Sequence, residues 1–367
     1  VRRASRAGSR RVRVDLLSST PPSAIEGSGT FVGLDGLARG LAALGHHVAL
    51  RSLRVRTGFH TLDRWLYNAA VAASPPRGDL VIGVDLDGFL WARWRRRRGR
   101  PPAFVAAPKG VIADELRNER GWVRVLLSLQ ARWERANLHG ADRVIVTSRY
   151  CADVVGTLYG VPPLHLAVVP EPIDLAEWSR WFAQAERRPR TRPTVLTVAR
   201  MYPRKRLSDL LAAAALLRGR IPALEVRIVG DGPEASSLRV QRQELGLGTT
   251  VTLLGDVSRR ALAEEYVNAD CFCLPSVQEG FGIVFTEAMA AGLPVVACRA
   301  AAIPEVVLDG VTGLLVRPRC PADLAQAMEL LLMDERLRND LGEAGLRRVQ
   351  EFDLAPVARR FLAACGR

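Results

Sequence analysis

Two glutamates, Glu279 and Glu287, are separated by seven residues in the run Pro275–Ala288. The apolar run 270–274 before them has the pattern of a buried strand, and 284–291 has the pattern of a helix. A strand, a glycine-bearing turn and a helix start direct backbone N–H groups and the positive end of a helix dipole toward an anion. One carboxylate would lie in the turn and the other about one helical turn further on. Because carboxylates accept hydrogen bonds from hydroxyls, the pair suits a ligand with both phosphate and hydroxyl groups.

The same run resembles the signature of retaining, nucleotide-sugar-dependent glycosyltransferases of family 4, which have the GT-B fold. The resemblance implies that Glu279 contacts the donor sugar and that Glu287 holds the ribose hydroxyls. It also implies that the backbone between them lies against the sugar and the phosphate, at Gly280, Phe281, Gly282, Ile283 and Val284. An ordinary strand-to-helix turn with two surface glutamates is the alternative, and the placement of the glycines favours the functional interpretation.

A pair of cations, Arg200 and Lys205, follows the first strand predicted in the second half of the chain. Lysine is rare in this sequence, which has only Lys109 and Lys205 among 52 basic residues. Two cations can stabilise the charge that develops on a leaving diphosphate without a metal ion. The segment resembles the family's segment in which an arginine and a lysine clamp the donor diphosphate. A solvated basic loop is the alternative.

Two glycine-rich turns complete the predicted donor site. Gly230 ends a strand in the sequence Val-Gly-Asp-Gly-Pro-Glu, which resembles the family's turn beside the nucleotide, although such a turn is also common elsewhere. Gly29 precedes an amphipathic helix, where backbone N–H groups of a glycine-rich loop could reach the donor phosphate from the opposite domain. The family usually has two adjacent glycines, whereas here Ser28 separates Gly27 from Gly29.

The main departure from the family pattern is a missing histidine. Many members have one after the fourth strand of the N-terminal domain, but the stretch Phe104–Val111 has none. Lys109 lies in this stretch and could bind a phosphate or an acceptor group, or alternatively a backbone carbonyl in the protein interior. Asp85 and Asp87 end another strand and are expected to point into the same cleft, where they could orient an acceptor hydroxyl.

The elements that must position these residues alternate between short apolar runs and helical patterns, which is typical of βαβ units with parallel sheets. Two sets of strands predict an α/β protein with two Rossmann-like domains that face each other across a deep cleft, as in GT-B. A ligand should bind in that cleft, at the carboxyl ends of the strands. The predicted strands are Val12–Leu17, Val48–Leu53, Leu80–Val84, Ala103–Ala107, Arg143–Thr147, Leu166–Val169, Thr194–Val198, Leu224–Val229, Val251–Leu254, Cys271–Leu274, Val295–Cys298 and Gly313–Val316.

The predicted domain organisation has four parts. Residues 1–182 form the acceptor-side domain, and residues 183–193, rich in Arg, Pro and Glu, form a linker. Residues 194–352 form the nucleotide-sugar-binding domain. The resemblance implies that residues 353–367 form a helix that crosses back to the N-terminal domain. A single helix is also predicted from Asp114 to about His139, with Asp114 and Glu115 as acids favoured by its dipole.

Composition excludes several classes of protein. The chain has 367 residues, of which 48% are hydrophobic, enough for two domains. Its six cysteines are scattered without a CxxC pair and its five histidines form no cluster, so neither a metal site nor a cofactor beyond the sugar nucleotide is expected. No uncharged apolar stretch reaches the length of a membrane span, and no apolar segment follows the basic N-terminus. We therefore expect a cytoplasmic protein.

The net charge of +14 comes with two arginine clusters. Arginine beside tryptophan suits an anionic membrane surface, so peripheral attachment to the cytoplasmic membrane face is a hypothesis, and a solvated basic surface is the alternative. No RNA-binding signature accompanies the clusters, so no specific nucleic-acid partner is expected. The first cluster comprises Arg2, Arg3, Arg6, Arg10, Arg11 and Arg13. The second comprises Arg93, Arg95, Arg96, Arg97, Arg98 and Arg100, interleaved with Trp91 and Trp94.

Together these features predict a retaining, metal-independent glycosyltransferase of the hexosyltransferase type. It would move a sugar from a UDP-sugar or GDP-sugar to a hydroxyl of a glycan or a lipid-linked glycan. Glu279, Arg200 and Lys205 would carry the chemistry, by front-face attack in which a phosphate oxygen takes the acceptor proton. Two alternatives remain open: a non-catalytic, membrane-associated protein that binds sugar nucleotides, and a sugar-nucleotide epimerase.

Overall fold

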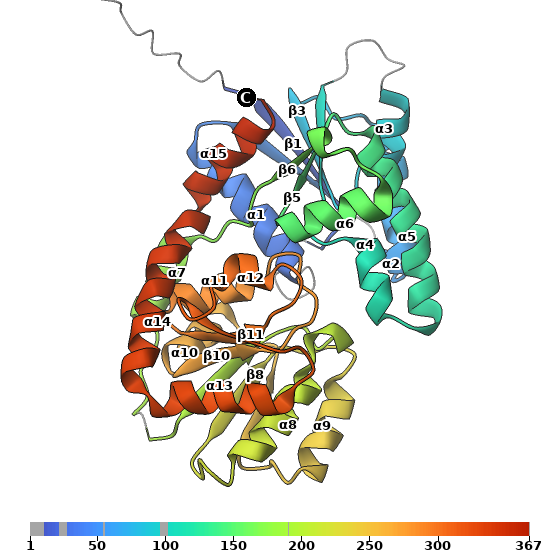
Figure 1. Ribbon diagram of the computed structural model, residues 1–367. Coiled ribbons are helices and arrows are strands. Elements are labelled where there is room, and N and C mark those ends of the chain that lie inside the picture. Colours follow the sequence, from blue (N-terminus) through green and yellow to red (C-terminus); the bar gives the residue numbers. More distant parts are fainter. Residues whose placement is uncertain (1–10, 22–27, 54–55, 96–101, 190, 367) are drawn as a thin grey trace, which may run out of the picture.

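The computed structural model describes residues 11–21, 28–53, 56–95, 102–189 and 191–366. The chain forms two α/β domains, one above the other in Figure 1, and each contains a six-stranded sheet. The strand order is β2-β1-β3-β4-β5-β6 in the N-terminal sheet and β12-β11-β10-β7-β8-β9 in the C-terminal sheet. Every strand pair is parallel.

All twelve predicted strands are present, and each bound agrees within one residue. The N-terminal strands are β1 Arg13–Ser18, β2 His47–Ser52, β3 Leu80–Val84, β4 Ala103–Ala107, β5 Arg143–Val146 and β6 Leu166–Val168. The C-terminal strands are β7 Thr194–Val198, β8 Glu225–Val229, β9 Val251–Gly255, β10 Cys271–Leu274, β11 Val295–Cys298 and β12 Gly313–Val316.

Most of the helices connect successive strands, and α13, α14 and α15 follow the last strand. In the N-terminal half they are α1 Ser28–Ala43, α2 His60–Ala73, α3 Phe89–Arg95, α4 Ile112–Glu115, α5 Gly121–Gly140, α6 Arg149–Tyr159 and α7 Leu175–Gln184. In the C-terminal half they are α8 Leu207–Leu217, α9 Ala235–Glu244, α10 Arg259–Val267, α11 Ile283–Ala290, α12 Ile303–Val306, α13 Pro321–Met333, α14 Glu335–Arg348 and α15 Leu354–Ala364. Short 3₁₀ turns are η2 Leu116–Asn118, η3 Pro163–His165, η4 Pro203–Lys205 and η5 Val349–Phe352.

The central strands are continuous apolar runs because both of their faces are covered. All five residues of β3 are buried, with Leu80 and Ile82 in one hydrophobic cluster and Val81 in the cluster on the opposite face. Strands buried on both faces are characteristic of parallel sheets, and this is why their bounds could be read from the sequence.

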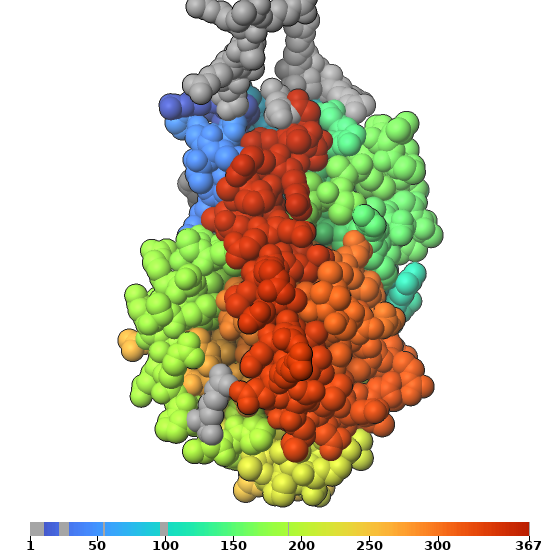
Figure 2. All heavy atoms as spheres, turned by 60° about the vertical axis from the view of Figure 1, so that its left-hand side comes forward, coloured from blue at the N-terminus to red at the C-terminus, as the bar shows by residue number. Residues whose placement is uncertain are grey.

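Two segments cross between the domains side by side. One leads from β6 to α7, and the other leads from η5 to α15, which packs against α1. The Ile173 N–H donates to the Phe352 carbonyl at 2.9 Å, and the Leu175 N–H donates to the Asp353 carboxylate at 3.3 Å. Figure 2 shows the second crossing as the red band formed by the last helices. Gly40 of α1 permits this packing, because a Cβ there would lie 2.7 Å from a carbonyl oxygen at the start of α15.

The structure corrects two predicted element bounds. The single helix predicted from Asp114 to His139 is wrong: α4 runs directly into η2, and α5 is separate from them because residues 119–120 are extended and Gly121 has a φ of 57°. Apolar periodicity on both sides of this break hid it in the sequence. In addition, α7 continues to Gln184, so the first two residues of the predicted linker are helical.

Candidate active site

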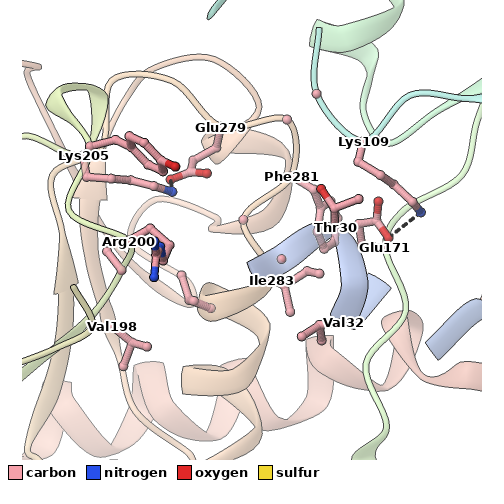
Figure 3. A pocket seen from close by; sticks show the side chains of 18 of the residues that line it. Thr30, Val32, Lys109, Glu171, Val198, Arg200, Lys205, Glu279, Phe281 and Ile283 are labelled. Carbon is pink, nitrogen blue, oxygen red and sulfur yellow. Dashed lines mark hydrogen bonds and ion pairs between the residues drawn. The ribbon is translucent and has the colours of Figure 1, made fainter. Parts of the chain in front are cut away.

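A cavity of about 530 Å³ lies between the two domains, at the carboxyl ends of both sets of strands. The N-terminal domain contributes Gly29, Lys109 and Glu171, among others, and the C-terminal domain contributes Arg200 and Glu279. Figure 3 shows the charged side chains from the two domains on opposite sides of this space. Its position at the strand ends is the usual ligand-binding position in open α/β folds.

The glycine turn between β10 and α11 forms part of the cavity wall. Gly282 precedes α11 with a φ of 94°, a left-handed conformation that favours glycine. Gly280 lies against the other domain, where an added Cβ would be 2.4 Å from the Lys109 carbonyl oxygen, and its own carbonyl accepts from the Thr147 hydroxyl at 2.7 Å. The predicted backbone residues Gly280 to Val284 therefore all line the cavity, beside the beginning of α11.

Glu279 and Lys205 form an ion pair in the cavity, with 2.5 Å between Lys205 Nζ and Glu279 Oε1. Their side chains are only 10% and 12% exposed, respectively. Burial lowers the pKa of Lys205, and the neighbouring carboxylate opposes that shift. Lys205 ends the turn η4, and Arg206 after it has a left-handed φ of 54°. The structure thus brings together the residues predicted to hold the sugar and the diphosphate.

Arg200 also lines the cavity, but its nearest anionic partner is distant. Its guanidinium lies 3.7 Å from the Asp256 carboxylate, and its side chain remains about one third exposed. A second arginine, Arg204, was missed in the sequence because it is one of several basic residues in the same loop. It stacks on Tyr202 at 4.8 Å and approaches Glu115 of the other domain at 3.9 Å. Several cations therefore converge on one side of the cavity.

Glu287 is more deeply buried than Glu279, and two side chains contact its carboxylate. The buried Tyr266 hydroxyl donates to Glu287 Oε2 at 3.0 Å, and the Arg259 guanidinium lies 3.5 Å from Oε1. Burial raises the pKa of Glu287, and Arg259 and Tyr266 oppose the shift. Arg259 also lies over the Trp178 ring at 5.0 Å, and that ring packs edge-on against Tyr266. None of these three neighbours was found in the sequence, because each reads as an ordinary surface or core residue of a helix.

Lys109 binds a side chain and not a backbone carbonyl. Its ammonium donates to Glu171 Oε2 at 2.8 Å, and both residues line the cavity (Figure 3). Burial raises the pKa of Glu171, and Lys109 lowers it. Glu171 directly follows the Val-Pro end of the β6 segment, so its place after a strand was the one signal that could have marked it.

The structure does not bring Asp85 and Asp87 into the cavity wall. Asp87 is buried and accepts hydrogen bonds from the Ser19 hydroxyl and from Asn68. Burial raises the pKa of Asp87 to about 6. Asp85 accepts from the Lys109 backbone N–H at 2.9 Å. The expected position of both carboxylates in the cleft is therefore wrong, because helix α2 and neighbouring loops of the same domain use them as hydrogen-bond acceptors.

The two predicted glycines Gly29 and Gly230 line the cavity from opposite domains. Gly230 has a φ of 116°, and a Cβ there would lie 2.1 Å from the Ala199 carbonyl oxygen, so only glycine fits. Nothing lies within 4 Å of a Cβ added to Gly29. Glu26 and Gly27, which belong to the same predicted loop, lie outside the described residues.

Direct contacts across the cleft join the domains without any ligand. Gln278 donates to the buried Asp114 carboxylate at 2.8 Å and accepts from Asn118 at 2.6 Å. Glu305 of α12 accepts from two backbone N–H groups at the first turn of α6, at 2.8 Å each. The sequence interpretation of Asp114 as a helix N-terminal acid missed its role as an acceptor for the opposite domain.

The second arginine cluster is only partly at the surface. Trp91 and Arg95 are buried, and the Arg95 guanidinium lies 5.6 Å over the Phe104 ring. Trp94 and Arg93 are exposed, so the predicted mixed arginine–tryptophan surface is wrong in half of its described members. Of the first cluster, Arg11 and Arg13 are described, and both are exposed. The other members of the two clusters lie outside the described residues: Arg2, Arg3, Arg6, Arg10, Arg96, Arg97, Arg98 and Arg100.

Within the described ranges, no three His, Cys, Asp or Glu side chains are grouped in a way that would hold a metal ion. In the same ranges, no helix combines the length and the apolar character that crossing a bilayer requires.

Comparisons with known proteins agree with this geometry. The family described as "Glycosyl transferases group 1" matches residues 180–348, and "Glycosyltransferase Family 4" matches residues 59–177. A GDP-mannose-dependent alpha-(1-6)-phosphatidylinositol monomannoside mannosyltransferase of Mycobacterium tuberculosis is 33% identical over 67% of this chain and 66% of its own length. A D-inositol 3-phosphate glycosyltransferase of Kribbella flavida is 34% identical over 63% of this chain and 58% of its own length. The alignments thus span about two thirds or less of these relatives.

The solved structure of sucrose-phosphate synthase from Thermosynechococcus elongatus superimposes with a TM-score of 0.78. The superposition covers 96% of this chain and 98% of the other, at 24% sequence identity. This likeness concerns the fold alone, and it confirms the predicted GT-B architecture of two facing Rossmann-like domains.

Proposed function

The chain belongs to glycosyltransferase family 4, and on this premise we propose that it is a retaining glycosyltransferase that uses a nucleoside-diphosphate sugar. The observation that carries the proposal is the Lys205–Glu279 pair in the interdomain cavity. A cation for the diphosphate and a carboxylate for sugar hydroxyls are adjacent, at the place where the bond between those two groups would break. A nucleoside-diphosphate sugar carries both a diphosphate and sugar hydroxyls, and few other ligands combine these two groups.

In the proposed reaction the bond between the anomeric carbon and the diphosphate oxygen breaks, and a bond to the acceptor oxygen forms on the same face. The acceptor proton passes to the departing phosphate oxygen. Lys205 and Arg200 would stabilise the charge that accumulates on the diphosphate, which makes a metal ion unnecessary in this scheme. Glu279 would accept hydrogen bonds from the sugar hydroxyls, and Glu287 from the ribose hydroxyls. The backbone of Gly29 would face the phosphates from the other domain.

The donor and acceptor classes are proposed from the relatives. The mannosyltransferase relative is named as GDP-mannose-dependent, so GDP-mannose is the first donor to test and UDP-sugars are the next. Its acceptor is a phosphatidylinositol monomannoside, and the other relative is named for inositol 3-phosphate. We therefore propose a lipid-linked or glycan acceptor that presents a polyol or sugar hydroxyl.

The test measures ligand-dependent melting and donor hydrolysis together. A ligand that binds only the folded state must raise its melting temperature, so GDP or UDP is expected to stabilise the wild type in the presence of EDTA. Lys205→Met and Arg200→Ala should reduce that shift, and Glu279→Gln should abolish slow hydrolysis of the sugar nucleotide. Arg260→Gln is the matched control, because Arg260 lies beside Arg259 but is 68% exposed and does not line the cavity. Absence of any nucleotide shift would refute the donor site. A shift with no hydrolysis or transfer would favour a non-catalytic binding protein.

A further inference from the structure

An apolar surface is exposed on the N-terminal domain, at the beginnings of α2 and α5. We define this α2–α5 surface by Phe59, which directly precedes α2, by Leu62, Trp65 and Leu66 of α2, and by Trp122, Val123, Val125, Leu126 and Leu129 of α5. Trp122 is 80% exposed and Phe59 is 74% exposed. The helices are joined through Gln130, which donates to the Thr61 hydroxyl at 2.7 Å and accepts from Arg64 at 3.2 Å.

The burial pattern of α5 is the reverse of that of an ordinary amphipathic helix on a protein surface. Its exposed stripe carries Trp122, Leu126 and Leu129 at helical spacing, whereas Gln130 and Glu134 are among its buried residues. A helix that covers a core normally turns its apolar face inward. Large apolar side chains exposed in this number on two helices that are joined by hydrogen bonds indicate a binding surface.

The charges around this surface are of one sign. In the described stretches 56–66 and 117–135, the charged side chains that are exposed are all arginine. The acids there are buried, as Asp63 and Glu134 are, or partly buried, as Glu119 is. An apolar patch with a cationic rim is complementary to an anionic bilayer, where aromatic and aliphatic side chains enter the interface and arginine meets the headgroups. The arginines are Arg56, Arg117, Arg120, Arg124, Arg132 and Arg135.

We propose that the α2–α5 surface binds the protein to anionic lipid bilayers. The position of the surface agrees with this role, because α4 directly precedes η2 and α5, and its residues Asp114 and Glu115 line the cavity. A bilayer against α5 would therefore present the headgroup of a lipid-linked acceptor near the cavity. The inference deepens the proposed function and rests on it for the nature of the acceptor. It also moves the membrane-binding surface away from the arginine cluster of α3, whose Trp91 and Arg95 are buried.

The test is sedimentation with vesicles of phosphatidylcholine alone or mixed with phosphatidylglycerol, at low and high salt. Wild type should sediment with the mixed vesicles at low salt and be released by high salt. Trp122→Ser should weaken the apparent partition coefficient about tenfold. Arg120→Gln combined with Arg132→Gln should weaken it by at least as much and reduce its dependence on salt.

Two substitutions are matched controls. Leu164→Ser removes a side chain that is 86% exposed on the same domain, and Arg336→Gln removes one that is 93% exposed on the other domain. Both should leave binding unchanged. The proposal is overturned if wild type does not bind the mixed vesicles, or if Leu164→Ser weakens binding as much as Trp122→Ser.

Light scattering of the protein without lipid tests the competing occupant, which is a second copy of this chain. A dimer that Trp122→Ser converts to a monomer would overturn the membrane proposal. The nucleotide-dependent melting shift, measured on the same samples, separates this inference from the proposed function. A retained GDP or UDP shift without vesicle binding refutes only the membrane surface, and vesicle binding without any nucleotide shift refutes only the donor site.

Discussion

Replacing Lys205 by methionine should destabilise the ligand-free protein as well as weaken nucleotide binding. At 2.5 Å, the attraction between Lys205 Nζ and Glu279 Oε1 is about 7 kcal/mol for an effective dielectric constant of about 20. Desolvation of the two groups offsets part of this. Leaving one buried charge without its partner is therefore expected to cost about 3–5 kcal/mol of unfolding free energy. For a domain of this size that corresponds to a fall in melting temperature of roughly 10 °C.

The double variant Lys205→Met/Glu279→Gln separates stability from binding. With both charges removed, the unfolding free energy should return to within about 1 kcal/mol of wild type, because no charge is left buried alone. Nucleotide affinity should stay low, because the cation for the diphosphate is still absent. Urea unfolding and nucleotide titration, made on the same preparations, measure the two quantities independently.

The matched control for this prediction is Glu329→Gln. Its ion pair with Arg220 has the same 2.5 Å separation, but the two side chains are 26% and 52% exposed. Exposed pairs contribute at most about 1 kcal/mol, so this variant should be nearly neutral. If Glu329→Gln and Lys205→Met cost the same, or if the double variant is less stable than Lys205→Met, the argument from burial is refuted.

The remaining predictions concern four other sites. Tyr266→Phe should weaken GDP or UDP binding about tenfold but leave binding of the 2′-deoxy nucleotides almost unchanged, because the hydroxyl acts through Glu287 and the ribose; an equal loss for both nucleotides would contradict this role. Gly230→Ala should destabilise the protein by about 3 kcal/mol in thermal unfolding because of backbone strain and the clash at its Cβ, and a neutral result would contradict the positive φ. Glu305→Gln should weaken contact between the domains, and X-ray scattering of the ligand-free protein should then report a larger radius of gyration; an unchanged radius would show that this contact does not hold the domains together. The pKa of Glu134 is raised by burial to about 8, so its contribution to stability is complete below its ordinary pKa and is lost as the pH rises toward 8. Glu134→Gln should therefore gain stability over wild type in urea at about pH 8 and not at about pH 5, and an equal gain at both would exclude this titration.

The strands could be predicted because burial on both faces leaves a continuous apolar signal in the sequence. The turn around Gly282 could be predicted equally well, since its glycines and the flanking strand and helix specify one local geometry. The positions of Glu279 and Lys205 followed from those local elements. The sequence could not show that these two side chains would lie in direct contact, because 74 positions separate them.

The features of the site that the sequence did not predict depend on packing between residues far apart in the chain. Glu171 lines the cavity and pairs there with Lys109, which comes from the end of another strand. Tyr266 reads as a core aromatic until its hydroxyl is seen to face Glu287. Asp87 fits the pattern of a strand-end carboxylate in a cleft, yet it is buried and accepts hydrogen bonds from Ser19 and Asn68. Local pattern therefore identified which residues could bind a ligand, but not which of them face one.

The paired crossings between the domains determine how the cleft can open. Because the segments at Ile173 and Asp353 are hydrogen bonded side by side, they act as one two-stranded pivot that resists twisting more than a single strand would. Figure 1 shows α4 on the opposite side of the molecule from α7 and α14, and the Asn118–Gln278 contact is made just after α4 in the chain. Because displacement grows with distance from a pivot, a rotation about these segments would separate the Asn118–Gln278 contact while the segments themselves barely move. Ligands are therefore expected to enter and leave on the side of α4, where opening of the domains would uncover the cavity.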